Sequence, residues 1–263
     1  MIRLGGTATQ SHKDAFEGLA TIFRRRGIDL DWVLYSGYDA LVDAFISKEI
    51  DIAWNGPLSY VKIKRRLDEP CQVIAMRDVD RNFVTNFITQ PGSDINTVED
   101  LIGKRFAFGS RGSVQTGLLA HHFLKQSGIN PKSDLASFTF HDERNVSLVS
   151  DEVDVIKRVT SGEYDAGAVS SQTLEKISRQ VAGQQESVRV FWSSPGYSHC
   201  CFTAQRDIGI GLYEEIEKAF TSIDPGEPTG KAVLEAEGCS ELVPGISEGW
   251  EIIEKAAYEE GLI

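Results

Sequence analysis

Residues 38–61 read YDALVDAFISKEIDIAWNGPLSYV, and this stretch decides the fold. Apolar side chains first recur every three or four residues, which predicts a helix over residues 38–48. They then alternate with polar ones from Ile50 to Trp54, which predicts a strand. The NGP triplet ends this strand, and its proline suits the first position of another helix, which runs to residue 67. Such alternation is typical of parallel strands covered by helices.

The same alternation continues on both sides of this stretch. Before it, a short strand, an amphipathic helix that ends at Gly27 and a second strand are expected. A second α/β series begins near Thr97, and mostly helical segments follow it to the C-terminus. In the second series, strands are predicted over residues 105–110, 136–142, 164–170 and 187–194, and helices over residues 116–128, 151–162 and 171–183.

Two α/β series in one chain predict two lobes. The chain shows no repeat or linker, so we expect compact crossover strands, near residues 85–90 and 192–198. Lobe 1 is then expected to comprise residues 1–88 and 193–263, and lobe 2 to comprise residues 89–192. Ligands of such proteins favour interdomain clefts at the carboxyl ends of strands, so an interdomain cleft is the expected binding site.

Composition excludes several classes of protein. The formal net charge of −12 argues against nucleic-acid binding, which requires a basic surface. No apolar run of about 18 residues exists, so an integral membrane protein is not expected. The four cysteines form no CxxC pair and are interpreted as small hydrophobic residues. No phosphate-binding P-loop, GxSxG or HExxH motif occurs, and we expect no cofactor and no metal.

The N-terminus leaves the cellular location open. Met1 is followed at once by the first predicted strand, so no secretory signal is visible. Either the protein is cytoplasmic, or its export signal has been removed and it is periplasmic or lipid-anchored. In both cases we expect a monomer.

Residues 38–61 strongly resemble the phosphonate/phosphite (PhnD-like) solute-binding proteins of ABC transporters. In that family, a Tyr-Asp-x-Leu-Val helix leads to a strand ending in Asp-Ile-Ala-Trp/Phe-x-Gly-Pro-x-Ser-Tyr. Residues 99–119, 155–174 and 228–256 also resemble family segments, in the family's order. The resemblance implies a type II periplasmic-binding-protein fold, with two α/β lobes that are joined by two crossover strands and close on a small ligand.

The resemblance also implies an anion-binding loop. In the family, a hydroxyl-rich loop at a helix N-terminus holds the phosphonate oxygens, and Ser113, Gln115 and Thr116 stand at matching positions. Ser113 and Thr116 keep hydroxyl groups, whereas Gln115 replaces a smaller hydroxyl residue. Amides at a helix start carry partial positive charge, which favours this role. The alternative is a plain helix cap, which contributes about 1 kcal/mol.

Four further candidates belong to the first series. Tyr38 matches a family aromatic residue that borders the ligand, although it could simply be a core tyrosine. Trp54 and Asn55 end a predicted strand where the cleft should open, and Asn55 could instead cap the following helix. Thr7 follows the first strand and is a candidate by the same topological reasoning.

Glu152 departs from the family pattern. It stands where the family commonly has a histidine that helps to hold the anion. A carboxylate repels a phosphonate dianion, so Glu152 in the cleft would favour a ligand with a positive or hydrogen-bond-donating group. Alternatively, Glu152 only stabilises the helix dipole, as Asp151 and Asp154 can. Ser170 stands where relatives often carry an acidic or amide residue near the ligand's distal group.

His199 follows the second crossover, at the expected rim of the cleft. A metal site formed with Cys200 and Cys201 is disfavoured, because three successive residues cannot easily converge on one ion.

The sequence therefore predicts a solute-binding protein rather than an enzyme. Its ligand would be small and anionic or zwitterionic, phosphonate- or phosphite-like, with room for an amino group, and it would be delivered to an ABC permease. The alternative is a cytosolic enzyme or ligand sensor on the same scaffold. In that case Glu152, His199 or Cys201 would transfer protons or act as a nucleophile.

Overall fold

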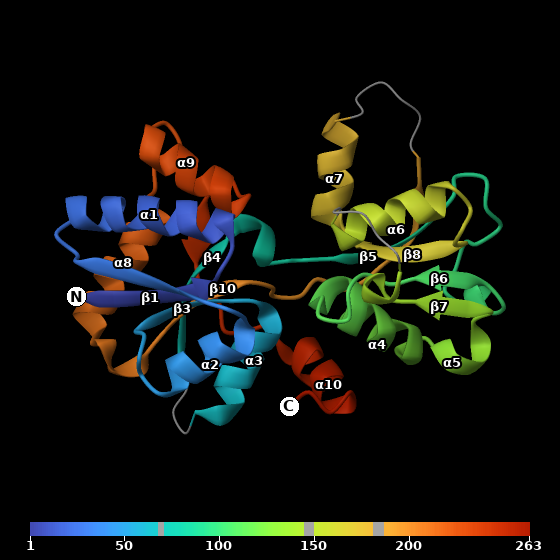
Figure 1. Cartoon of the computed structure of the whole chain (residues 1–263), viewed down its shortest axis with the longest axis horizontal. Helices are drawn as coiled ribbons and strands as arrows, with labels where there is room; N and C mark the ends of the chain where they lie inside the picture. Colours follow the sequence, from blue (N-terminus) through green and yellow to red (C-terminus); the bar gives the residue numbers. More distant parts are fainter. Residues whose placement is uncertain (68–70, 145–149, 181–186) are drawn as a thin grey trace. The chain divides into compact units, whose positions relative to one another are not determined.

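The structure is a computed structural model that describes residues 1–67, 71–144, 150–180 and 187–263. The described chain forms two compact units, each with its own sheet (Figure 1). The predicted lobe boundaries stay a prediction. Contacts divide the chain into a first unit of residues 1–82, 197–254 and 261–263 and a second unit of residues 83–196 and 255–260.

The first unit contains a six-stranded sheet in the order β11-β4-β10-β3-β1-β2. β1 runs parallel to β2 and β3, as the alternation predicted, whereas β10 is antiparallel to β3 and β4. The sheet is therefore mixed, with both parallel and antiparallel strand pairs. The strands are β1 (Ile2–Thr7), β2 (Leu30–Tyr35), β3 (Ile52–Asn55), β4 (Gln72–Arg77), β10 (Cys201–Ala204) and β11 (Leu242–Pro244).

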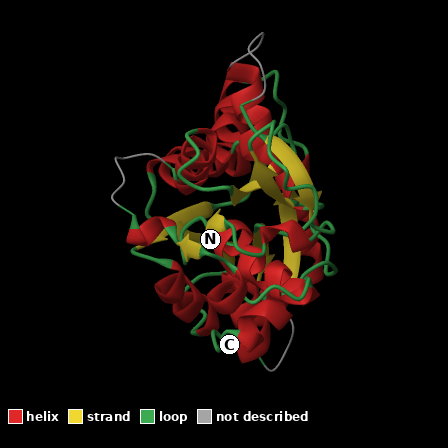
Figure 2. Cartoon of the chain, turned by 90° about the vertical axis from the view of Figure 1, so that its right-hand side faces the viewer, coloured by secondary structure: helices red, strands yellow, loops and turns green. Residues whose placement is uncertain are grey.

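Helices pack against this sheet and bury its apolar side chains. Figure 2 shows helices flanking the strands. α1 packs along α9, and Phe23 of α1 meets Phe220 of α8 with ring centroids 4.9 Å apart. Trp54 stacks on Phe202 of β10 at 4.3 Å, so this core reaches the end of β3. The helices are α1 (Gln10–Arg25), α2 (Tyr38–Ile46), α3 (Pro57–Arg66), α8 (Ile210–Thr221), α9 (Pro228–Glu237) and α10 (Glu251–Glu259), whose residues from 255 onward group with the second unit.

The second unit contains a five-stranded sheet in the order β7-β6-β8-β5-β9. β6 is parallel to β7 and β8, and β5 is antiparallel to β8 and β9. The strands are β5 (Thr85–Thr89), β6 (Arg105–Ala107), β7 (Ser137–Thr139), β8 (Ala166–Ser170) and β9 (Arg189–Ser193). The helices are α4 (Leu119–Gln126), α5 (Pro131–Asp134), α6 (Asp151–Thr160) and α7 (Ser171–Gln180). The predicted end of α7, residues 181–183, lies outside the described residues.

The helix predicted from residue 116 begins differently from expectation. Its first turn, Val114–Leu118, is a π-turn in which the Leu118 amide donates to the Ser113 carbonyl at 3.0 Å. Gly117 permits this wide turn, because a Cβ atom there would lie 2.3 Å from the Ser110 carbonyl oxygen. Such turns are rare in proteins, and those that occur are often found at functional sites. This one places the predicted anion-binding residues.

Candidate functional site

In the second unit, the ends of two parallel strands bring the candidate residues together. Ala107 at the end of β6 pairs with Gly167 of β8, so the segments that follow both strands leave the same edge of the sheet. The first segment leads into the π-turn, and the second is Ser170 at the start of α7. This is the edge at which α/β proteins bind ligands.

Ser113 is the cap of the π-turn. Its hydroxyl accepts a hydrogen bond from the Thr116 amide at 3.3 Å and lies 2.7 Å from the Thr116 hydroxyl. The capping alternative is therefore correct for Ser113, without settling whether a ligand also binds there. Thr116 is completely buried.

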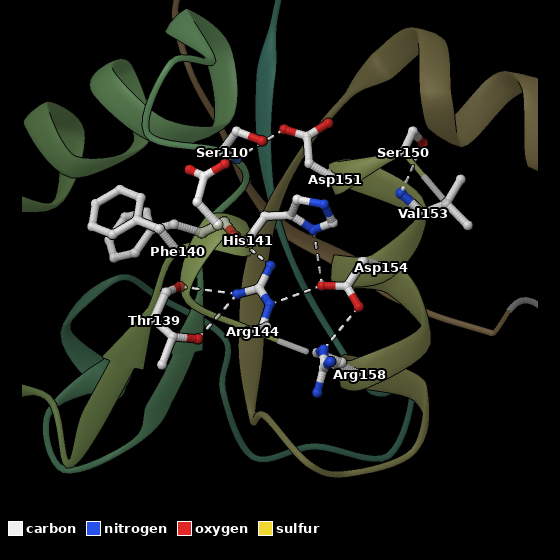
Figure 3. Close-up of polar contacts among 12 residues, drawn as sticks. Ser110, Thr139, Phe140, His141, Arg144, Ser150, Asp151, Val153, Asp154 and Arg158 are labelled. Atoms are coloured by element: carbon white, nitrogen blue, oxygen red, sulfur yellow. Dashed lines mark hydrogen bonds and ion pairs between the residues drawn. The ribbon is translucent and has the colours of Figure 1, made fainter. Parts of the chain in front are cut away.

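Asp151 reaches this loop from the first turn of α6. Its Oδ2 atom accepts hydrogen bonds from the Ser110 amide at 2.9 Å and from the Thr116 hydroxyl at 3.3 Å. Figure 3 shows the contact with Ser110. Gly109 allows this approach, because a Cβ atom there would lie 2.6 Å from Oδ2. The sequence analysis gave Asp151 only a helix-dipole role and missed this contact.

Glu152 joins two other candidates. It is 6% exposed, and its Oε2 accepts from the Ser170 amide at 2.8 Å and the Ser170 hydroxyl at 2.7 Å. Its Oε1 accepts from the Gln115 side-chain amide at 3.1 Å. The structure thus brings Gln115, Glu152 and Ser170 into one polar network, which helix-dipole stabilisation alone does not require.

A buried arginine holds α6 in this position (Figure 3). Arg144 donates to the carbonyl oxygens of Phe108 and Thr139 at 2.8 and 3.0 Å, and to Asp154 of α6 at 2.8 Å. Burial raises the pKa of the Asp154 carboxyl, but the hydrogen bond from Arg158 and the charge of Arg144 outweigh it and lower that pKa. The first turn of α6 is therefore anchored to the ends of β6 and β7.

In the first unit, Thr7, Tyr38 and Asn55 follow or end the parallel strands β1, β2 and β3. Because parallel strands end at one edge of a sheet, these residues belong to that edge. Tyr38 lies against Gly56, where a Cβ atom would come within 3.1 Å of its ring. Tyr38 is 47% exposed overall, yet burial of its hydroxyl end, together with Cys200, raises its pKa to about 12.

His12 connects two of these candidates and was missed by the sequence analysis. Its Nδ1 lies 2.8 Å from the Thr7 carbonyl oxygen, and its Nε2 lies 3.1 Å from Nε1 of Trp54. A carbonyl only accepts and an indole N–H only donates, so His12 is neutral with its proton on Nδ1. Burial lowers the pKa of His12, which agrees with this neutral state. No sequence signal distinguished His12 from the other polar residues of α1.

Asn55 is directed into the protein. It is fully buried, and its Nδ2 donates to the Thr203 hydroxyl at 2.8 Å and to the Ala53 carbonyl at 3.2 Å. Its Oδ1 has no hydrogen-bond partner among the described residues. These contacts tie β3 to the neighbouring strand β10.

His199 belongs to a buried charge network. Its Nδ1 lies 3.2 Å from Asp80, and Asp80 receives two hydrogen bonds from Arg77, at 2.5 and 2.9 Å. Burial lowers the pKa of His199, but Cys200 and Asp80 outweigh it and raise that pKa to about 9. Ligand atoms of Asp80, His199 and Cys200 lie within 4.8 Å of one another. The guanidinium of Arg77 already supplies to Asp80 the positive charge that a metal ion would bring.

Fold and site together define the class. The chain has the type II periplasmic-binding-protein fold, with two mixed β-sheets that are each covered by helices. Polar side chains and a helix start lie at the ends of the parallel strands. Residues 7–248 match the sequence model described as "ABC transporter, phosphonate, periplasmic substrate-binding protein". The chain belongs to this family and has its role, the binding of a substrate for delivery to a permease. Among the described residues, no helix has the length and apolar character needed to cross a bilayer.

Individual relatives agree with this assignment. The probable ABC transporter phosphite-binding protein PhnD1 of Prochlorococcus marinus (strain MIT 9301) is 26% identical over 242 residues, which are 87% of this chain and 77% of that protein. The structure of PhnD1 with methylphosphonate has a TM-score of 0.72 at 23% identity and covers 100% of this chain and 98% of that one. A binding protein of an ABC phosphonate transporter from Pseudomonas aeruginosa has a TM-score of 0.66 at 14% identity, with 99% and 86% covered. These structural likenesses concern the fold.

Proposed function

We propose that the protein captures a small anionic or zwitterionic molecule, phosphonate- or phosphite-like, with or without an amino group. The proposed contact region is the cluster of the second unit, by which we mean the polar residues Ser113, Gln115, Thr116, Asp151, Glu152 and Ser170. The observation that carries the proposal is the composition of this cluster. Two hydroxyl groups 2.7 Å apart, on a helix start, adjoin a network of an amide, a carboxylate and a serine. Such closely set donors and acceptors suit a compact polar ligand.

The proposed setting follows from the family. We propose that the protein works in the periplasm, free or lipid-anchored, as a monomer that releases its ligand to an ABC permease. Candidate residues of the first unit, namely Thr7, Tyr38 and Trp54, remain further proposed ligand contacts.

The alternative of an enzyme receives little support from the geometry around His199. Cys201, the candidate nucleophile, is completely buried, and burial raises the pKa of its thiol. The neighbouring Cys200 is no better placed. Cys200 Sγ lies 3.1 Å from Nδ1 of His199, and Asp80 approaches the same nitrogen at 3.2 Å. A catalytic triad requires the base to meet its nucleophile and its carboxylate through different nitrogens. This arrangement resembles a charge network rather than an activated nucleophile.

The test removes the paired hydroxyl groups. In the double variant Ser113→Ala/Thr116→Val, we expect the affinity for the best-binding member of a panel to fall more than tenfold. The panel contains methylphosphonate, phosphite and aminoethylphosphonate, and isothermal titration calorimetry gives the affinities. Native mass spectrometry of the purified protein identifies any ligand that is carried through purification, and this ligand is then included in the panel.

The matched control is Thr97→Val/Ser133→Ala, which removes two exposed hydroxyl groups of the same unit outside the cluster. It should bind like the wild type. If the affinity of Ser113→Ala/Thr116→Val is unchanged while the variant remains folded, these residues are not ligand contacts.

A further inference from the structure

The cluster of the second unit already contains an anion, which is the carboxylate of Asp151. Its Oδ2 accepts from the Ser110 amide (Figure 3). It also accepts from the Thr116 hydroxyl. Both donors belong to the loop that was expected to hold a ligand anion. The carboxylate therefore occupies, from within the chain, hydrogen-bond donors that a ligand oxyanion would use.

The hydroxyl protons show how completely these donors are used. Thr116 has one hydroxyl proton and gives it to Asp151, so the short contact with Ser113 must use the Ser113 proton. The Ser113 oxygen in turn accepts from the Thr116 amide. A ligand oxyanion would have to break this chain of hydrogen bonds before it could receive either hydroxyl proton.

Glu152, the next residue in the sequence, is a second carboxylate that accepts hydrogen bonds at the same edge of the sheet. Glu152 takes the amide and the hydroxyl of Ser170 and the side-chain amide of Gln115. Two adjacent carboxylates disfavour a doubly charged oxyanion by direct repulsion. They would instead attract an ammonium or amidinium group, or another hydrogen-bond donor.

The position of Asp151 is imposed by the fold. Ser150 caps α6 by accepting from the Val153 amide at 3.4 Å, and Arg144 binds Asp154 one turn further along. The first turn of α6 is thus fixed at both ends (Figure 3). Asp151 cannot leave the loop without either a change of its rotamer or a shift of this anchored turn.

We infer that Asp151 is the specificity-determining residue of the site. Its carboxylate excludes fully ionised oxyanions from the loop of Ser110 to Thr116 and selects ligands that present a cationic or hydrogen-bond-donating group to the second unit. This inference rests on the proposed function, since it assumes that the cluster binds the ligand.

The experiment compares the wild type with Asp151→Asn. The asparagine keeps an oxygen that can accept from the Ser110 amide but removes the charge. Calorimetry at pH 8 with methylphosphonate as the probe should give at least tenfold tighter binding for the variant. Aminoethylphosphonate, which adds an ammonium group, should gain less than methylphosphonate. A gain below tenfold for methylphosphonate, including no binding by either protein, overturns the inference.

The control is Asp94→Asn, which removes the same charge from the second unit. Asp94 is exposed and follows β5, whose end pairs with the beginning of β8, at the sheet edge opposite Ser170. The affinity of the Asp94→Asn variant for methylphosphonate should stay within twofold of the wild type. If Asp151→Asn does not fold, as judged by thermal unfolding, Asp151→Ser is measured against the same tenfold criterion.

Failure of the inference and failure of the proposed function give different results. If Asp151→Asn gains nothing while Ser113→Ala/Thr116→Val still loses affinity, the cluster binds the ligand and Asp151 does not select it. If the double variant loses nothing, the cluster is not the binding site.

Discussion

At the scale of single residues, hydrogen bonds decide which buried carboxyl groups remain charged. Glu237, near the end of α9, is 5% exposed, and its Oε1 has no hydrogen-bond partner among the described residues. Burial raises its pKa to about 7, although Arg77 partly offsets this effect. Asp80 is also buried, yet the hydrogen bonds from His199 and Arg77 outweigh burial and keep its pKa below the ordinary value. The difference lies in the hydrogen bonds that each carboxyl group receives.

Glu237 should make the stability of the protein depend on pH. A carboxyl group whose pKa is raised in the folded state contributes to the free energy of unfolding. This contribution is fully present below the pKa of the unfolded state, near 4.5, and is lost as the pH rises through about 7. Glu237→Gln has no titrating proton at this position, so its free energy of unfolding should not show this loss. The difference between variant and wild type in the free energy of unfolding should therefore shift in favour of the variant by about 2–3 kcal/mol between pH 5 and pH 8. Denaturant unfolding at both pH values measures this difference.

Glu235→Gln provides the control on the same helix, because the Glu235 side chain is exposed. Its effect on stability should be the same at both pH values. A pH-independent effect of Glu237→Gln would contradict the proposed role of the buried carboxyl group.

At the scale of elements, the sequence predicted local structure better than contacts between distant segments. The helix–strand–helix unit of residues 38–61 was predicted, because each of its elements is encoded by neighbouring residues. The antiparallel pairing of β10 with β3 was not predicted, because it joins segments about 150 residues apart. The pairing of parallel strands that the alternation indicated is present in β1–β3 and β6–β8.

The candidate site follows the same rule. Ser113 could be recognised as a cap because its partner is three residues away. The contact between Asp151 and Ser110 spans 41 residues, and no local pattern reports it. The link between Trp54 and His12 spans 42 residues and was missed for the same reason.

The π-turn should depend on the absence of a side chain at Gly117. Gly117→Ala would place a Cβ atom 2.3 Å from a backbone oxygen, and backbone cannot yield as a flexible side chain can. We expect a loss of about 1–3 kcal/mol in the free energy of unfolding, measured by urea denaturation.

Gly211→Ala is the matched helical control. Gly211 lies in α8, and a Cβ atom there would meet no atom within 4 Å. Alanine should stabilise this helix by about 0.5 kcal/mol. Equal effects of the two substitutions would show that helix propensity, and not the close approach at the π-turn, controls Gly117.

At the scale of the whole molecule, each unit has its own apolar cluster. One cluster includes Phe16, Phe23 and Phe202 of the first unit, and the other includes Val155 and Val159 of the second. Proteins with more than one core often depart from two-state unfolding. We therefore expect the units to lose their structure in separable steps.

Differential scanning calorimetry should show two components. Gly117→Ala should lower the midpoint of one component by about 2–10 °C. Glu237→Gln at pH 8 should raise only the other, because Glu237 belongs to the first unit. A single transition that both substitutions move would show that the two cores unfold together.

The π-turn also affects how this chain is compared with others. Such a turn contains one more residue than an α-helical turn, so every side chain of α4 is rotated by about 100° relative to a continuous α-helix from Ser113. One of these side chains, His122, contacts Glu259, with its Nδ1 2.7 Å from Oε2. A homologue with an ordinary first turn therefore requires a one-residue gap within Val114–Leu118. Without that gap, an alignment would pair buried positions of one helix with exposed positions of the other.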